Sequence, residues 1–236
     1  MSNQFSSLAA NEALANTFID AMARVYLWMT GGLLITAVVA AGVASSDELI
    51  FTLTSNPILF WGIILGQLGL VLGISALINK IAPMTALALF FLYSGLMGVM
   101  LSVILLNYDL GTVGIAFGVT SGTFAGLSIV GLTTKKDLTR LGPLLMAALF
   151  GLIIASLANW FMQSGALEWL ISYAGVLIFM GLTLYQTKKI KTMTFEALAN
   201  GDAQAVNRIG VMGALQLYLS FINLFLFILR IVGGRR

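Results

Sequence analysis

The chain has 236 residues, of which 59% are hydrophobic and only 9% are charged, with a formal net charge of +3. Soluble domains carry about 25% charged residues, so this composition excludes a soluble globular protein. The sequence contains no cysteine and no histidine, which excludes disulfides, the usual zinc sites, thiol nucleophiles and a Ser-His catalytic pair, and no metal or cofactor is expected.

Seven hydrophobic segments are predicted to cross a membrane as helices, because about 20 apolar residues span a hydrocarbon core of about 30 Å. They lie near 23–44, 58–79, 84–106, 111–132, 142–162, 167–187 and 210–232. Pro57, Pro83 and Pro143 fall in or just before the first turn of a span, where proline costs no helical hydrogen bond. The predicted fold is an all-α integral membrane bundle of seven transmembrane helices, with a polar cytoplasmic segment at 1–22 and a single membrane domain at 23–236.

The charges between the spans predict the orientation. Arg24 lies at the start of the first span, and further basic residues occupy the second, fourth and sixth connections. The opposite connections and their edges carry acidic residues and no Lys or Arg, namely Asp47, Glu48, Asp109 and Glu168. The positive-inside rule therefore places the N-terminus in the cytoplasm.

Small residues recur every four positions on one face of three predicted helices. The stripes are Gly114, Gly118, Gly122 and Gly126, then Ser94, Gly98 and Ser102, then Ala147, Gly151 and Ala155. In lipid, close backbone approach through small residues supplies packing energy between helices, so each stripe is expected to pack tightly. A thin helix that lines a pathway is the alternative for the glycine stripe at 114–126.

The last span carries a narrow polar stripe within an arc of about 80°, at about 100° per residue. The stripe consists of Gln216, Ser220, Asn223 and Arg230. Polar groups are costly in lipid, so the stripe is expected to face the inside of the bundle. On the sixth span, Thr183 and Gln186 share a face. Both interhelical hydrogen bonding and a wet pathway remain open, while the absence of carboxylates from the middle of every span disfavours a tight divalent cation site.

Three strings of the sequence resemble the Bax inhibitor-1 family, and look most like its bacterial branch. They are TTKKDL at 133–138, GLTLYQT at 181–187 and LYLSFINLF at 217–225. The resemblance covers nearly the whole chain. It implies a seven-helix fold with the last helix central, a place in the bacterial inner membrane, and a calcium leak. In that activity two aspartates on the last two helices share a proton and latch the pore, so that pH controls the flux.

Gln186 and Ser220 stand where the family has these two aspartates. Neither side chain titrates in an accessible range, so a hydrogen bond between them would form a permanently neutral latch. The resemblance then implies a calcium leak pathway or its non-titrating variant, with Gln186 and Ser220 at the latch. The supporting polar face would comprise Gln216, Asn223, Thr183 and Arg230.

A non-conducting membrane regulator is the alternative function. Its partner would be a membrane protease complex or another membrane protein, which the family also allows in bacteria. An intramembrane enzyme is not expected, because the chain lacks His, Cys and mid-span carboxylates. The basic charge is explained by membrane topology, so no nucleic-acid partner is expected.

Overall fold

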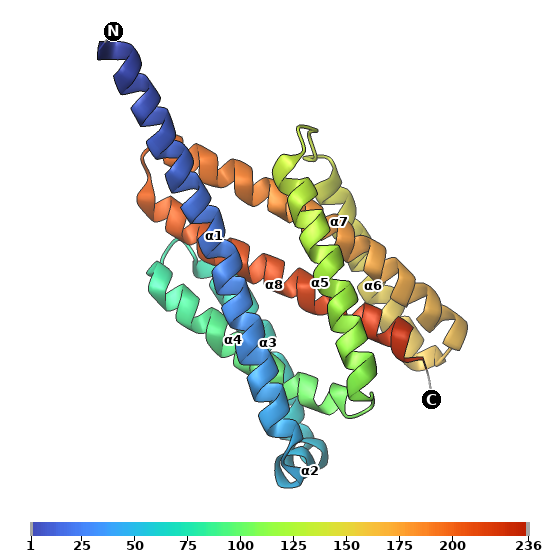
Figure 1. Ribbon diagram of the computed structural model, residues 1–236. Coiled ribbons are helices and arrows are strands. Elements are labelled where there is room, and N and C mark those ends of the chain that lie inside the picture. Colours follow the sequence, from blue (N-terminus) through green and yellow to red (C-terminus); the bar gives the residue numbers. More distant parts are fainter. Residues whose placement is uncertain (1, 235–236) are drawn as a thin grey trace. The chain divides into compact units, whose positions relative to one another are not determined.

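The computed structural model describes residues 2–234, and the side chains of residues 14–234, as an all-helical chain (Figure 1). These residues form α1 (Ser2–Ala44), α2 (Asp47–Ser55), α3 (Pro57–Leu77), α4 (Pro83–Leu105), α5 (Leu110–Thr133), α6 (Leu141–Met162), α7 (Gly165–Ala199) and α8 (Ala203–Gly233). Within this described part, seven helices are long and apolar enough to cross a membrane, namely α1 from Leu14 onward and α3 to α8. The predicted all-α fold with seven spans is confirmed.

The chain forms two compact units. Unit 1 contains residues 1–106 and 190–215, and unit 2 contains residues 107–189 and 216–236. Both α7 and α8 therefore contribute residues to each unit. The last helix, α8, is the most buried span: 56% of its apolar window is buried, against at most 33% in the other spans.

Two of the predicted span boundaries lie far from the observed helix ends. The helix α1 begins at Ser2, so the predicted polar segment 1–22 is continuous with the first span. The sixth span was expected to end at 187, but α7 continues to Ala199, and Gly201 turns the chain into α8 with a φ of 69°. Hydropathy marks only the part of a helix that lies in lipid, whereas Lys, Glu and Ala extend a helix beyond it.

The helix α2 was not predicted and occupies the first connection. Ser46 caps its N-terminus, because the Ser46 side chain accepts a hydrogen bond from the Leu49 amide. Asp47 and Glu48 lie in its first turn, where negative charge is favourable near the positive end of the helix dipole.

In unit 1, α1 and α4 lie side by side through the predicted stripe of Ser94, Gly98 and Ser102 (Figure 1). A Cβ atom added to Gly98 would lie 2.6 Å from the Thr36 carbonyl oxygen and 2.8 Å from the Val39 Cβ. The Thr36 hydroxyl donates to the Ser94 carbonyl oxygen at 2.8 Å. The prediction of close backbone packing is confirmed for this stripe.

The other two stripes do not pack in this way, so that prediction was wrong for them. Among the described residues, no atom lies within 4 Å of a Cβ added to Gly114, Gly118, Gly122, Gly126 or Gly151. The face of α5 that is buried carries Ala116, Thr120, Phe124 and Ser128. These residues follow the glycines by two positions, or about 200°, so they lie on the opposite side of the helix. The Phe124 ring packs against Phe221 of α8 with centroids 5.4 Å apart.

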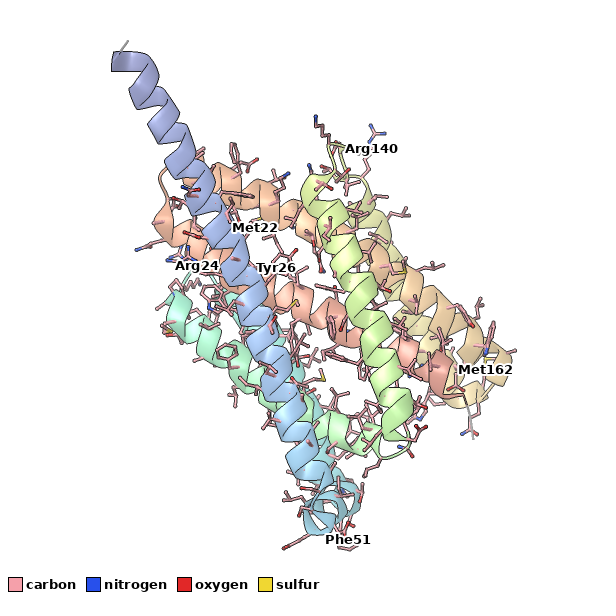
Figure 2. All side chains as sticks on the ribbon, in the orientation of Figure 1. Met22, Arg24, Tyr26, Phe51, Arg140 and Met162 are labelled. Atoms are coloured by element: carbon pink, nitrogen blue, oxygen red, sulfur yellow. The ribbon has the colours of Figure 1, made fainter. Side chains whose placement is uncertain are left out.

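The connection between α5 and α6 is held by polar contacts. It ends at Arg140, which precedes α6, and Met162 is the last residue of that helix (Figure 2). The Lys188 ammonium donates to the Thr134 carbonyl oxygen at 2.7 Å, where α5 ends. The Asp137 carboxylate accepts from the hydroxyl and the amide of Thr139, at 2.6 and 2.9 Å. These two donors, and then the charge of Lys188, lower the pKa of Asp137 below its ordinary value of 3.8.

The substitution Gly98→Ala is expected to destabilise unit 1 by about 1–3 kcal/mol, because the new Cβ would overlap the backbone of α1. Gly122→Ala is the matched control, since a Cβ there meets no neighbour within 4 Å and alanine favours a helix more than glycine. Thermal unfolding of the detergent-solubilised protein measures the difference. Equal melting temperatures for the two variants would contradict the packing described for Gly98.

Asp137→Ala is expected to loosen the connection between α5 and α6, because Thr139 loses its acceptor. Hydrogen exchange at residues 135–140 should then be severalfold faster, while Lys136→Ala leaves it unchanged. Since the pKa of Asp137 is lowered, its carboxylate stabilises the turn at any pH above about 3.8 and loses this effect as the pH falls through the lowered pKa. Protection factors, which are corrected for the intrinsic pH dependence of amide exchange, report on the turn. Lower protection of the native protein near neutral pH than below the lowered pKa would contradict this assignment.

Candidate functional site

Gln186 and Ser220 are in direct contact in unit 2. The Ser220 hydroxyl on α8 donates to the Gln186 side-chain oxygen on α7 at 2.8 Å. Ser220 is only 1% exposed, and Gln186 is half-buried. The serine is thus the donor, and a hydrogen bond between neutral groups joins the two positions at which the resemblance implies aspartates.

A cavity of about 910 Å³ lies beside this pair, with walls from α6, α7 and α8. Along α6 its lining runs from Gly142 to Trp160. At about 1.5 Å per residue this is about 27 Å, close to the thickness of about 30 Å of a hydrocarbon core. The cavity therefore follows nearly the whole membrane-spanning length of α6.

Contacts at glycines set the positions of the three walls. A Cβ added to Gly142 of α6 would overlap the ring of Tyr185 of α7, and one added to Gly181 of α7 would lie 2.7 Å from Leu145 of α6. A Cβ on Gly175 of α7 would lie 2.7 Å from the Phe227 ring of α8. The helix α7 thus packs closely against α6 and against α8. The cavity is lined by residues of all three helices.

The cavity contains polar groups but little charge. Gln216, Ser220 and Asn223 of the predicted stripe line it together with Gln186. The Asn223 amide donates to the Leu219 carbonyl oxygen of its own helix at 2.8 Å, whereas Gln216 has no hydrogen-bonding partner within the part of the chain that the structure describes. Lys189 is the single charged residue in the described lining, which includes no carboxylate.

Two residues of the predicted polar face lie elsewhere. Thr183 is fully buried, but its hydroxyl donates to the Phe179 carbonyl oxygen of its own helix at 2.8 Å, and it does not line the cavity. Arg230 is exposed near the end of α8, with its guanidinium 5.6 Å from the centroid of the Phe227 ring. There it lines two smaller cavities, of about 550 and about 170 Å³, each of which also includes Glu168.

Sequence reasoning missed Tyr185, Lys189 and the whole α6 wall. Lys189 had been counted only as a topological charge, although it follows Gln186 by three residues and so lies on the same helical face. No spacing of residues in the sequence indicated the α6 wall. That wall depends on the contacts of Gly142 with Tyr185 and of Gly181 with Leu145, which join two different helices. Groups of three or more Asp and Glu side chains that could hold a metal ion are absent from the described residues.

Comparison with known proteins agrees with the resemblance in the sequence. The model of the family described as inhibitor of apoptosis-promoting Bax1 matches residues 16–236. The inner membrane protein YbhL of Escherichia coli K12 is 45% identical over 215 residues, which cover 91% of this chain and 92% of that protein. An uncharacterized protein of Borreliella burgdorferi is 46% identical over 215 residues, which cover 91% of this chain and 92% of that protein. An uncharacterized membrane protein of Streptococcus pyogenes serotype M1 is 40% identical over 189 residues, which cover 79% of this chain and 80% of that protein.

The seven apolar helices and the inner membrane relative identify a multi-pass protein of the bacterial inner membrane. The cytoplasmic location of the N-terminus stays a prediction from the charge pattern. The family model covers all but the first 15 residues, and the relatives match over most of their own lengths. The chain belongs to the Bax inhibitor-1 family.

Proposed function

We propose that this protein provides an ion leak pathway of the Bax inhibitor-1 type whose latch does not titrate. The observation that carries the proposal is the hydrogen bond of 2.8 Å between Ser220 and Gln186 beside a long cavity. The resemblance implies that two aspartates at these positions would share a proton and separate when both are charged. A hydroxyl and an amide keep their hydrogen bond at acidic and alkaline pH alike, because neither group changes its charge.

The composition of the cavity supports a slow leak of low selectivity. Lys189 repels cations at one end, and no described carboxylate of the lining compensates for it. Calcium is normally bound by charged oxygen ligands, so the ion would pass only through amide and hydroxyl oxygens and water. Flux through this protein is expected to be small.

A second function, that of a non-conducting regulator, is favoured by a different surface. Family members are membrane regulators or channel-like proteins. On α5 the glycine stripe at 114–126 is exposed and meets no neighbour within 4 Å among the described residues. Such a flat helix face permits close approach by a helix of another membrane protein. A membrane protease complex is the partner proposed for this function.

Calcium entry into dye-loaded liposomes that hold the purified protein tests the first function. Flux above that of empty liposomes, with little difference between acidic and alkaline pH, is expected from a neutral latch. A steep pH response would overturn the neutral latch. If no flux occurs at either pH and a stoichiometric partner is recovered from membranes, the protein is a regulator.

The double substitution Gln186→Asp and Ser220→Asp should create a pH-dependent flux. The two side chains touch at 2.8 Å, well within the range of about 4–6 Å at which like charges couple strongly, so one of the two pKa values should rise. The two single substitutions are the controls, because a lone carboxylate has no like charge to repel. Normal elution on size exclusion with flux unaltered by pH in the double variant would show that these positions do not gate a pathway.

A further inference from the structure

The cavity in unit 2 has one basic end. Lys189 lines it together with Gly142 and Pro143, which lie in the first turn of α6, and it follows Tyr185, the residue in contact with Gly142, by one turn. The exposed Arg140 immediately precedes that turn and makes no side-chain cap, so the positive end of the α6 dipole adds to the basic charge. The exposed residues Lys135 and Lys136 lie in the same connection. The charge pattern predicts that this end faces the cytoplasm.

Next to the basic end, the lining carries amides. Gln186 lies one turn from Lys189 on α7. The contacts of Gln186 with Ser220 and of Gly175 with Phe227 show that α7 and α8 run antiparallel here, so Gln216 lies at about the level of Lys189. Since Gln216 has no partner among the described residues, its amide has donors available to a ligand.

Farther along the cavity the lining is apolar. Its walls there are formed mainly by Leu149, Leu152, Ile153, Phe179 and Leu182. The two polar residues of this part are bonded to their own helices: Asn223 donates to Leu219 and Ser156 donates to Leu152, both at 2.8 Å. This stretch therefore suits hydrocarbon better than a polar ligand.

We propose that this cavity binds one anionic phospholipid of the inner membrane. Its phosphate lies at Lys189, its ester carbonyls lie near the amides of Gln186 and Gln216, and its acyl chains follow the apolar wall of α6. The order of anion, ester and hydrocarbon in such a lipid matches the order of cation, amide and apolar side chain along the cavity. The volume of about 910 Å³ is near the upper end of ordinary ligand cavities, about 300–1,000 Å³. The lipid would occupy the same cavity as the proposed ion leak, but its binding is measured without flux, so the failure of one proposal can be told from the failure of the other.

Phosphatidylglycerol and phosphatidylcholine with identical acyl chains are the probes, added to the full-length detergent-solubilised protein. Native mass spectrometry should show one phosphatidylglycerol retained per chain and little phosphatidylcholine, with a higher melting temperature in phosphatidylglycerol. Lys189→Gln should weaken phosphatidylglycerol binding about tenfold, the effect expected from losing one charged hydrogen-bond donor. Lys189 is exposed, so this variant should fold normally.

Lys80→Gln is the matched control, since it removes the same charge from an exposed lysine between α3 and α4 in unit 1. It should leave binding unchanged, and equal losses in the two lysine variants would overturn the site.

Leu149→Trp should also abolish the retention of phosphatidylglycerol, because the larger side chain fills the space along the apolar wall. Glycerol phosphate has the anion without the chains and should not stabilise the protein. Stabilisation by glycerol phosphate equal to that by the lipid, or retention unaffected by Leu149→Trp, would overturn the assignment to a phospholipid.

Discussion

Inside a hydrocarbon core, each polar group must find its partner within the protein, and this requirement shapes both units. Several hydroxyls in the described spans meet it locally by donating to a carbonyl oxygen of their own helix, as Thr183 does to Phe179 at 2.8 Å, whereas the buried hydroxyls of Ser128 and Thr187 have no partner among the described residues. Thr36 meets it twice, since its hydroxyl lies 2.9 Å from the Gly32 carbonyl oxygen and 2.8 Å from that of Ser94 on another helix. Ser220 differs, because its hydroxyl bonds to the side chain of Gln186 on another helix and so ties α8 to α7.

That bond joins α7 and α8 without charge, at the two positions where the resemblance implies a carboxylate pair. A buried carboxylate pair must share a proton or separate, because two like charges at contact distance are strongly unfavourable in a low dielectric. An amide and a hydroxyl fill similar space and satisfy each other without that conflict. The hydrogen bond between Ser220 and Gln186 does not depend on the protonation of either side chain. A neutral site of this kind is compatible with a constant leak or with no conduction. In either case, the state of the site depends less on pH than that of a carboxylate pair would.

The sequence predicted those features that depend on one helix at a time. Spans of about 20 apolar residues are long and continuous, so hydropathy identified all seven. The polar stripe on α8 was also predicted, because its four members fall within one narrow arc, and three of them line the cavity. The glycine stripe at 114–126 was misinterpreted, since spacing shows which residues share a face but not what that face meets. The α6 wall depends on contacts between Gly142 and Tyr185 and between Gly181 and Leu145, which no single-helix pattern contains.

Lys188 and Lys189 are neighbours in the sequence but have different surroundings. The Lys188 ammonium is fixed at 2.7 Å to the backbone oxygen where α5 ends, whereas Lys189 faces the cavity, with its ammonium 6.0 Å from the centroid of the Tyr185 ring. A helix as long as α7, with 35 residues, has more length than one bilayer crossing requires and is free in principle to slide along its axis. The lysine at the end of α5 acts against such sliding, because any axial shift of α7 would break its bond. This lysine therefore helps to fix the position of Gln186 along α7 relative to the end of α5.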